Sequence, residues 1–121
     1  MAITASNDQG LEANIDSRFG RAPYFTIVDI DTMDTKVIDN SASNAASGAG
    51  VSAAQTIAEE GVEAVISQNF GPKAFDSLKA GALKLYSFSG KKVKEAVEKF
   101  KQGTLEELSA PTNKPHSGLN R

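Results

Sequence analysis

The sequence predicts one α/β domain with a mixed five-stranded sheet flanked by helices, in the order β-β-β-α-β-α-β-α. Residues 48–86 contain two consecutive units, each a helical pattern closed by glycine and followed by a short apolar run. The part of the chain before them contains β-branched and aromatic runs separated by turns rather than helices. Helix–strand units predict neighbouring parallel strands joined by right-handed crossovers, whereas two runs joined by a tight turn predict an antiparallel hairpin.

The N-terminal part is expected to supply three strands. Residues 2–6 alternate briefly between apolar and polar, and residues 24–30 are rich in β-branched and aromatic side chains, which favours a strand. Residues 31–34 are typical of a tight turn, so residues 35–38 should return as an antiparallel partner. Residues 11–15 alternate as well and fit either a loop or a short strand.

Two helix–strand units follow. In the first, Gly61 stands where a C′ glycine belongs, residues 62–66 resemble a buried strand, and one helical face is apolar, formed by Val51, Ala54, Ile57 and Ala58. In the second, Pro72 suits the first helical position, Gly81 is the expected stop, and residues 82–86 form the next strand.

A third helix shows the clearest amphipathic pattern. Ser89 is a candidate N-cap, Gly103 marks the end, and the apolar positions are Val93, Ala96, Val97 and Phe100. Leu105 and Leu108 are expected to fold back onto the core.

The domain is therefore expected to span residues 1–108. Residues 109–121 are rich in Pro, Ser and Asn and have no apolar period, so we expect a disordered tail, in which His116 is solvated. Residues 39–47 are small and polar, which fits a flexible surface connection or, alternatively, a mobile lid over the first helix.

Composition excludes several classes of function. The chain has no cysteine, which removes disulfides, thiolate catalysis and thiolate-held clusters, and its one histidine lies in the expected tail. The net charge of −2 gives no reason to expect a nucleic-acid partner. No apolar run is long enough for a membrane span and no signal peptide is visible, so a cytoplasmic protein is expected.

The ends of parallel strands and the helix N-termini that follow them locate a candidate anion site. Such sheets bind ligands beyond the carboxyl ends of their strands, where helix N-termini point. Two arginines in residues 18–23 could add a two-pronged anion grip. The candidate cofactor-binding residues are Arg18, Phe19, Arg21, Gly48, Gly50, Asn69, Gly71 and Lys73.

Each of these features also has a purely structural interpretation. A lone G-x-G at residues 48–50 is a weak phosphate signal and fits a helix start that needs positive φ or close packing equally well. The arginines could pair with nearby carboxylates such as Asp16 or Asp29. If they do bind an anion, nothing beyond Leu108 is expected to be needed for binding.

Metal-dependent hydrolysis is the least favoured alternative. Two-metal chemistry needs several carboxylates converging on one point. The expected first strand carries none, Glu63 is the only acid of the fourth, and Asp29 and Asp31 lie beside a turn. We therefore expect no catalytic or metal-ligating residues. An early hairpin followed by parallel units agrees instead with a ribonuclease-H-like arrangement.

Residues 2–108 resemble the dinitrogenase iron–molybdenum cofactor biosynthesis family. The matching segments include 18–25 (RFGRAPYF), 48–50 (GAG), 71–74 (GPKA), 81–86 and 100–105 (FKQGTL). The resemblance implies a ribonuclease-H-like α/β fold. It also implies a non-enzymatic protein that binds, carries or delivers an iron–sulfur or iron–molybdenum cofactor or precursor, with a cofactor-receiving protein as a further partner.

Because the chain has no cysteine, direct ligation of a cluster by soft side chains is not expected. The alternative from the residues themselves is a domain that binds a phosphorylated small molecule at the same helix N-termini.

Overall fold

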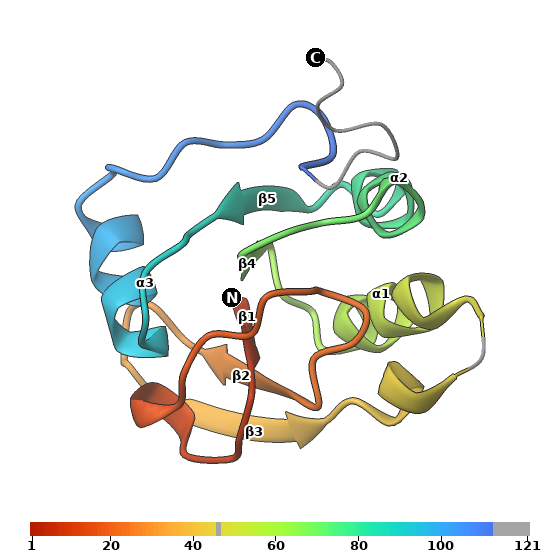
Figure 1. Ribbon diagram of the computed structural model, residues 1–121. Helices are drawn as coiled ribbons and strands as arrows, with labels where there is room; N and C mark the ends of the chain where they lie inside the picture. The colour runs from red at the N-terminus through yellow and green to blue at the C-terminus, as the bar shows by residue number, and fades with distance from the viewer. Residues whose placement is uncertain (46, 113–121) are drawn as a thin grey trace.

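The computed structural model describes residues 1–45 and 47–112, which form a five-stranded mixed sheet with helices on both faces (Figure 1). The order across the sheet is β3-β2-β1-β4-β5. Strands β1, β2 and β3 pair antiparallel, whereas β4 pairs parallel with both β1 and β5. The α/β class, the mixed sheet and the hairpin are therefore confirmed. The strands are β1 (Ala2–Ala5), β2 (Tyr24–Val28), β3 (Thr35–Asp39), β4 (Ala64–Ser67) and β5 (Lys84–Ser87).

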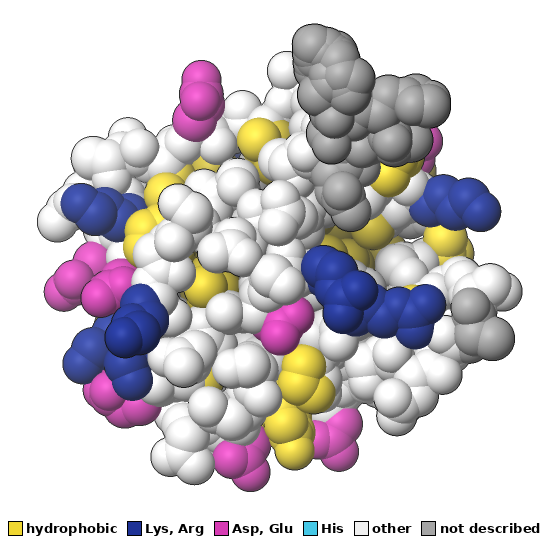
Figure 2. Space-filling model, in the orientation of Figure 1, with side chains coloured by type: hydrophobic (Ala, Val, Ile, Leu, Met, Phe, Trp, Pro, Cys, Tyr) yellow, Lys and Arg dark blue, Asp and Glu magenta, His cyan; other side chains and the backbone are white. Residues whose placement is uncertain are grey.

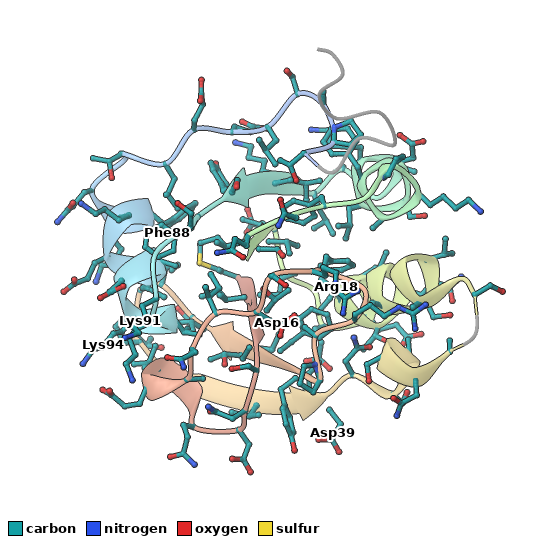
Figure 3. The ribbon with its side chains drawn as sticks, viewed as in Figure 1. Asp16, Arg18, Asp39, Phe88, Lys91 and Lys94 are labelled. Carbon is teal, nitrogen blue, oxygen red and sulfur yellow. The ribbon has the colours of Figure 1, made fainter. Side chains whose placement is uncertain are left out.

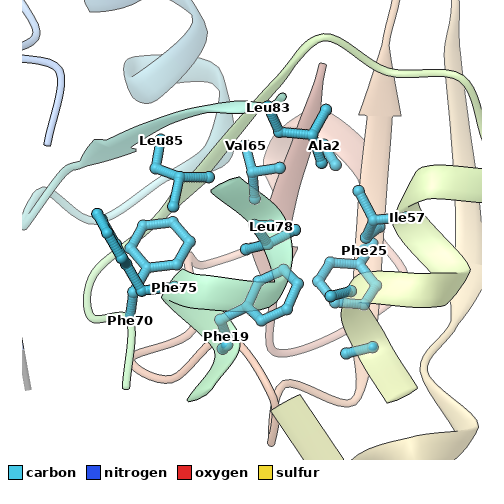
Figure 4. Packing of buried hydrophobic residues seen from close by; sticks show 13 residues of the cluster. Ala2, Phe19, Phe25, Ile57, Val65, Phe70, Phe75, Leu78, Leu83 and Leu85 are labelled. Atoms are coloured by element: carbon cyan, nitrogen blue, oxygen red, sulfur yellow. The ribbon is translucent and has the colours of Figure 1, made fainter. Parts of the chain in front are cut away.

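Helices α1 (Ala49–Glu59) and α2 (Pro72–Ala80) cover one face of the sheet, and α3 (Val93–Lys101) covers the other (Figure 1). The two central strands, β1 and β4, therefore send side chains into two cores. Figure 4 shows the core under α1 and α2, which contains Ala2, Phe25, Ile57, Val65, Leu78 and Leu85. The core under α3 contains Ile3, Val28, Ile66, Val93 and Val97. Burial on both faces explains why both central strands are mostly apolar.

The buried face of α1 differs from the expected one. Val51 is only half-buried and Ala58 is exposed, whereas Ala53, outside the expected stripe, is fully buried. The helix is rich in small residues, so its apolar period is weak. The sequence therefore does not distinguish the buried face from one that is shifted by one residue.

The two glycines at the helix ends act differently. Gly61 follows the last turn of α1 with a φ of +72°, as expected for a C′ glycine. Gly81 caps α2 with a φ of −85°, and the left-handed conformation falls on Ala82, whose φ is +64°. Gly81 therefore marks the end of α2, but its own backbone conformation does not require glycine.

Helix α3 begins after Lys92, so the expected N-cap at Ser89 is wrong. The carboxylate of Glu95 accepts the N–H groups of Lys91 (3.0 Å) and Lys92 (3.1 Å). These two backbone hydrogen bonds lower the pKa of Glu95, because they favour its charged form. The start of the helix is therefore stabilised by the Glu95 carboxylate, which accepts backbone N–H groups that precede it, rather than by a hydroxyl cap.

Two connections expected to be irregular contain short 3-10 helices, at Gly10–Glu12 and Ser41–Asn44. Residues 11–15 form no strand of their own, although Ile15 bridges Ala5 and Asn14 bridges Lys92. The interpretation of residues 11–15 as a loop is therefore the better one.

After α3 the chain crosses β5 and returns towards α2 (Figure 1); we call residues 104–112 the C-terminal strap. Leu108 donates its N–H to Leu85 O at 2.7 Å, and Leu105 and Leu108 pack on the cores, as expected. Thr112 donates its N–H to Phe70 O at 3.2 Å, so the start of the expected tail is held against the domain. Residues 113–121, with His116, lie outside the described residues.

Alanine at Gly61 and at Gly81 should have different effects on stability. A methyl group at Gly61 meets no atom within 4 Å, and at Gly81 the nearest atom is Leu78 O at 3.5 Å. Only Gly61 has positive φ, so Gly61→Ala should lower the free energy of unfolding by about 1 kcal/mol. Gly81→Ala should change it by less than about 0.5 kcal/mol. Urea denaturation measures both, and equal losses would show that φ is not the cause.

Candidate functional site

A hollow of about 450 Å³ lies where α1 and α2 begin, beyond the carboxyl end of β4. Three segments of the chain meet there: the loop before β2, the start of α1, and the turn from β4 into α2. The hollow is lined by Arg18, Phe19, Gly20, Arg21, Ala49, Gly50, Asn69, Gly71, Pro72, Lys73 and Ala74. Each expected site residue except Gly48 lies on its wall. The structure thus brings together residues that are up to 55 positions apart in the sequence (Arg18 and Lys73, from 73 − 18).

Backbone contact at glycine holds the three segments together. A Cβ atom on Gly20 would lie 2.8 Å from both Cα and N of Gly50, and one on Gly50 would lie 2.9 Å from the Cβ of Ala74. No side chain fits at either position, because real Cβ contacts do not become this short. The first turns of α1 and α2 are therefore packed directly against each other, with the Gly20 loop on top.

Both helix N-termini line this hollow. The first helical bond of α2 runs from Phe75 N–H to Gly71 O (2.9 Å), so the N–H groups of Lys73 and Ala74 have no helical acceptor. In α1 the first such bond runs from Ser52 N–H to Gly48 O (3.0 Å). Neither helix has a side-chain cap. Two sets of helix-start amides are available to an anion.

The positive side chains at the rim are Arg18 and Lys73, both exposed. Figure 2 shows basic side chains beside apolar surface in this region, and Figure 3 places Arg18 between α1 and α2, with Asp16 nearby. Asp16 accepts the backbone N–H of Arg18 through Oδ2 at 3.2 Å. Within the described residues, neither arginine forms a salt bridge, so the alternative of ion pairing with Asp16 or Asp29 is not observed.

Arg21 has a different task from Arg18. Its Nη1 donates to Ser43 O at 3.0 Å and to Ala45 O at 2.6 Å, which holds the 3-10 helix of residues 41–44 beside the start of α1. Asn40, which is 3% exposed, donates from the same side to Gly20 O and Ala22 O. Both arginines line the hollow, but Arg21 also positions a loop, whereas the Arg18 guanidinium has no hydrogen bond within the described residues.

Two further expected residues are also held by structural contacts. Phe19 is 1% exposed and its ring lies 5.3 Å from Phe25 and 5.7 Å from Phe70, so it forms the apolar floor of the hollow. Asn69 donates from Nδ2 to Ser17 O at 3.1 Å and accepts the N–H of Phe19 at 3.2 Å. Asn69 joins the Arg18 loop to the turn after β4.

Gly48 precedes α1 as its N-cap with a φ of +73° and does not line the hollow. Of the two structural reasons for the G-x-G pattern, Gly48 meets the need for positive φ and Gly50 the need for close packing. Within the connection of residues 39–47, residues 41–44 form a 3-10 helix whose start is capped by the side chain of Asn40.

In the described part of the chain, the site offers hydrogen-bond donors but no group of metal-ligating side chains. The chain has no cysteine, and within residues 1–45 and 47–112 no three His, Asp or Glu residues gather in a way that could hold a metal ion. A second hollow, of about 470 Å³, lies by the start of β4 and is lined by Asp29, Asp31, Glu60 and Glu63, which disfavours an anion. In the part of the chain that the structure describes, no helix is both long and apolar enough to cross a membrane.

Sequence reasoning missed three residues that build the site. Gly20, Asn40 and Thr112 act through contacts 18 or more positions away along the chain, and no local pattern marks them. The one available signal was the F-G pair of residues 19–20, since glycine after a buried aromatic residue can indicate close backbone packing.

The chain was compared with known families and solved structures. A sequence model of the family described as dinitrogenase iron–molybdenum cofactor matches residues 1–103. An uncharacterized protein of Methanocaldococcus jannaschii is 37% identical over 93 residues, which cover 74% of this chain and 79% of that one.

Two solved structures have the same fold. The apo form of the orange protein from Desulfovibrio gigas gives a TM-score of 0.89 at 36% identity, covering 93% of this chain and 94% of that one. A Thermotoga protein named for NifB gives a TM-score of 0.80 at 38% identity, covering 93% and 95%.

The contact between Gly50 and Ala74 can be tested by a double-mutant cycle. Gly50→Ala should be destabilising by about 1–3 kcal/mol from overpacking, offset in part by the better helix propensity of alanine. In an Ala74→Gly background the new methyl group has room, so the same change should stabilise α1. A coupling free energy of about 1 kcal/mol or more is expected. Purely additive effects in urea denaturation would show that the two residues do not press on each other.

Proposed function

This chain belongs to the dinitrogenase iron–molybdenum cofactor family, and we propose that it is a non-enzymatic carrier that binds an anionic metal–sulfur cofactor or precursor as its cargo. We place the cargo in the hollow between the starts of α1 and α2. The observation that supports this proposal is the convergence of two helix N-termini without side-chain caps and two exposed cations, Arg18 and Lys73, on one hollow.

The donors in the hollow fit the surface of an anionic cluster rather than its metal atoms. Without cysteine there is no thiolate to replace a sulfide, and the described residues hold no carboxylate or histidine group suited to a metal. Backbone N–H groups, a guanidinium and an ammonium can donate to sulfide or oxide on the outside of a cluster. Phe19 and the nearby methyl groups supply an apolar floor for a large, weakly hydrated anion.

Such contacts predict reversible binding. A helix N-terminus favours negative charge by about 0.3–1 kcal/mol when exposed, and hydrogen bonds to charged groups contribute about 1.5–3 kcal/mol each. A few of them reach micromolar affinity, which suits a protein that must release its cargo to a receiving protein. Because Arg18 and Lys73 are exposed, the affinity should fall as ionic strength rises.

We also assign the fold to the ribonuclease-H-like class. An antiparallel hairpin on one side of β1 and two parallel helix–strand units on the other support this assignment.

A phosphorylated small molecule is the second candidate cargo. The same helix-start amides and guanidinium suit phosphate. The apolar floor formed by Phe19 favours the cluster, since phosphate is more strongly hydrated than a sulfide-rich anion.

Replacing Arg18 should weaken binding of an anionic probe. We suggest tetrathiomolybdate, a coloured dianion that contains the molybdenum and sulfide of the cofactor for which the family is named. In an anaerobic titration at low salt, Arg18→Ala should weaken binding by at least about tenfold, the value of one charge-assisted hydrogen bond. At high salt the affinities of wild type and Arg18→Ala for tetrathiomolybdate should differ less, because salt screens the charge of Arg18.

Two controls sharpen this titration. Lys99→Ala removes one exposed positive charge from α3, on the other face of the sheet, and should leave the affinity within about twofold. Asp16→Asn removes a negative charge beside Arg18 but keeps an oxygen for the Arg18 N–H, so it should strengthen binding. The proposal fails if Arg18→Ala binds as wild type does, or if inorganic phosphate displaces tetrathiomolybdate at equal concentration.

A further inference from the structure

We propose that Thr112, in the C-terminal strap, is a positioning residue for this hollow: it orients Asn69, whose side-chain amide holds Ser17 before Arg18 and whose main-chain oxygen holds Phe19 after it. The inference rests on the proposed function and adds a residue to its site. Thr112 lies beyond residues 1–103, which match the family, and beyond the domain end expected at Leu108.

The hydroxyl of Thr112 contacts two groups of the turn after β4. Phe70 N–H donates to Thr112 Oγ1 at 2.8 Å, and Thr112 Oγ1 donates to Asn69 Oδ1 at 3.4 Å. Thr112 N–H donates to Phe70 O at 3.2 Å, which sets the strap in register with the turn. A hydroxyl is required here, because it accepts one hydrogen bond and donates another at the same atom.

Asn69 transmits this contact to the arginine loop. With Oδ1 facing the strap, Nδ2 faces Ser17 O at 3.1 Å, so the orientation of the amide is defined from both ends. The main-chain oxygen of Asn69 accepts the N–H of Phe19 at 3.2 Å. The residues before and after Arg18 are therefore both hydrogen-bonded to Asn69.

Arg18 depends on this support more than Arg21 does. Arg21 is positioned by two hydrogen bonds of its own guanidinium, whereas Arg18 is exposed and its placement follows from its backbone. A fixed backbone leaves only the side-chain torsions to be ordered when an anion binds, which lowers the entropic cost of binding. Loosening Asn69 should therefore weaken binding without removing any group that touches the anion.

Tetrathiomolybdate titrations of three threonine variants test this inference. Thr112→Val keeps the shape and removes the hydroxyl, and should bind about three- to tenfold more weakly, the effect of one or two hydrogen bonds. Thr112→Ser keeps the hydroxyl and should bind within about twofold of wild type. The matched control is Thr104→Val, since Thr104 lies in the same strap and donates its hydroxyl to Lys99 O at 3.1 Å, away from the hollow.

Hydrogen exchange without ligand separates this inference from the proposed function. In Thr112→Val the amide proton of Phe19 should exchange faster than in wild type, while that of Ile57, in the last turn of α1, should not change. If wild type leaves tetrathiomolybdate free, the proposed function fails, and Phe19 exchange still decides whether Thr112 positions the loop. Unchanged exchange at Phe19, or equal weakening in Thr112→Ser or Thr104→Val, would overturn the inference.

Truncation gives an independent check and revises the expectation that binding needs nothing beyond Leu108. A chain ending at Thr112 keeps both hydrogen bonds with Phe70, one accepted by the hydroxyl and one donated by the main-chain N–H, and should bind as the full chain does. A chain ending at Leu108 loses them and should bind as weakly as Thr112→Val. Equal affinity of the two truncated chains would contradict the role of Thr112.

Discussion

Close packing of Gly20 on Gly50 and of Gly50 on Ala74 is the constraint on which the candidate site depends. The contact leaves no room for a Cβ atom at either glycine, so the first turns of α1 and α2 lie against each other. The two helix starts therefore line one hollow rather than two separate surfaces. The charge preference of the site follows from this geometry, because each helix start carries partial positive charge.

The polar residues around the hollow divide into those that hold the loop and those left for a ligand. Asn40, Asn69 and Arg21 use their side chains to tie the loop of residues 17–22 to neighbouring segments. Arg18 and Lys73 remain exposed at the rim. Among the described residues, a loop tied in this way that presents the exposed guanidinium of Arg18 is well suited to the proposed site, in which a cargo would be held by hydrogen bonds and released.

The fold could be predicted largely from local patterns, since the hairpin, the two helix–strand units and the third helix each leave a period or a turn in the sequence. Where the structure differs from the expected pattern, the difference has a physical cause. In α1 the small side chains make the apolar period weak, and at the end of α2 Gly81 is the expected stop but the left-handed conformation is taken by Ala82. The place of the site followed from the rule for parallel sheets, but the different tasks of Arg18 and Arg21 did not. Those depend on carbonyl groups at Ser43 and Ala45, and no local pattern shows which arginine will reach them.

In the proposed complex, helix-start amides and Arg18 hold an anionic cargo without a covalent ligand. The most direct test is a titration of the ¹⁵N-labelled protein with tetrathiomolybdate, followed by amide chemical shifts. We expect the largest shifts at Ala49, Gly50, Lys73 and Ala74 and at the Arg18 loop. Shifts centred on the acidic hollow around Asp29 and Glu63, or none at the two helix starts, would contradict this proposal.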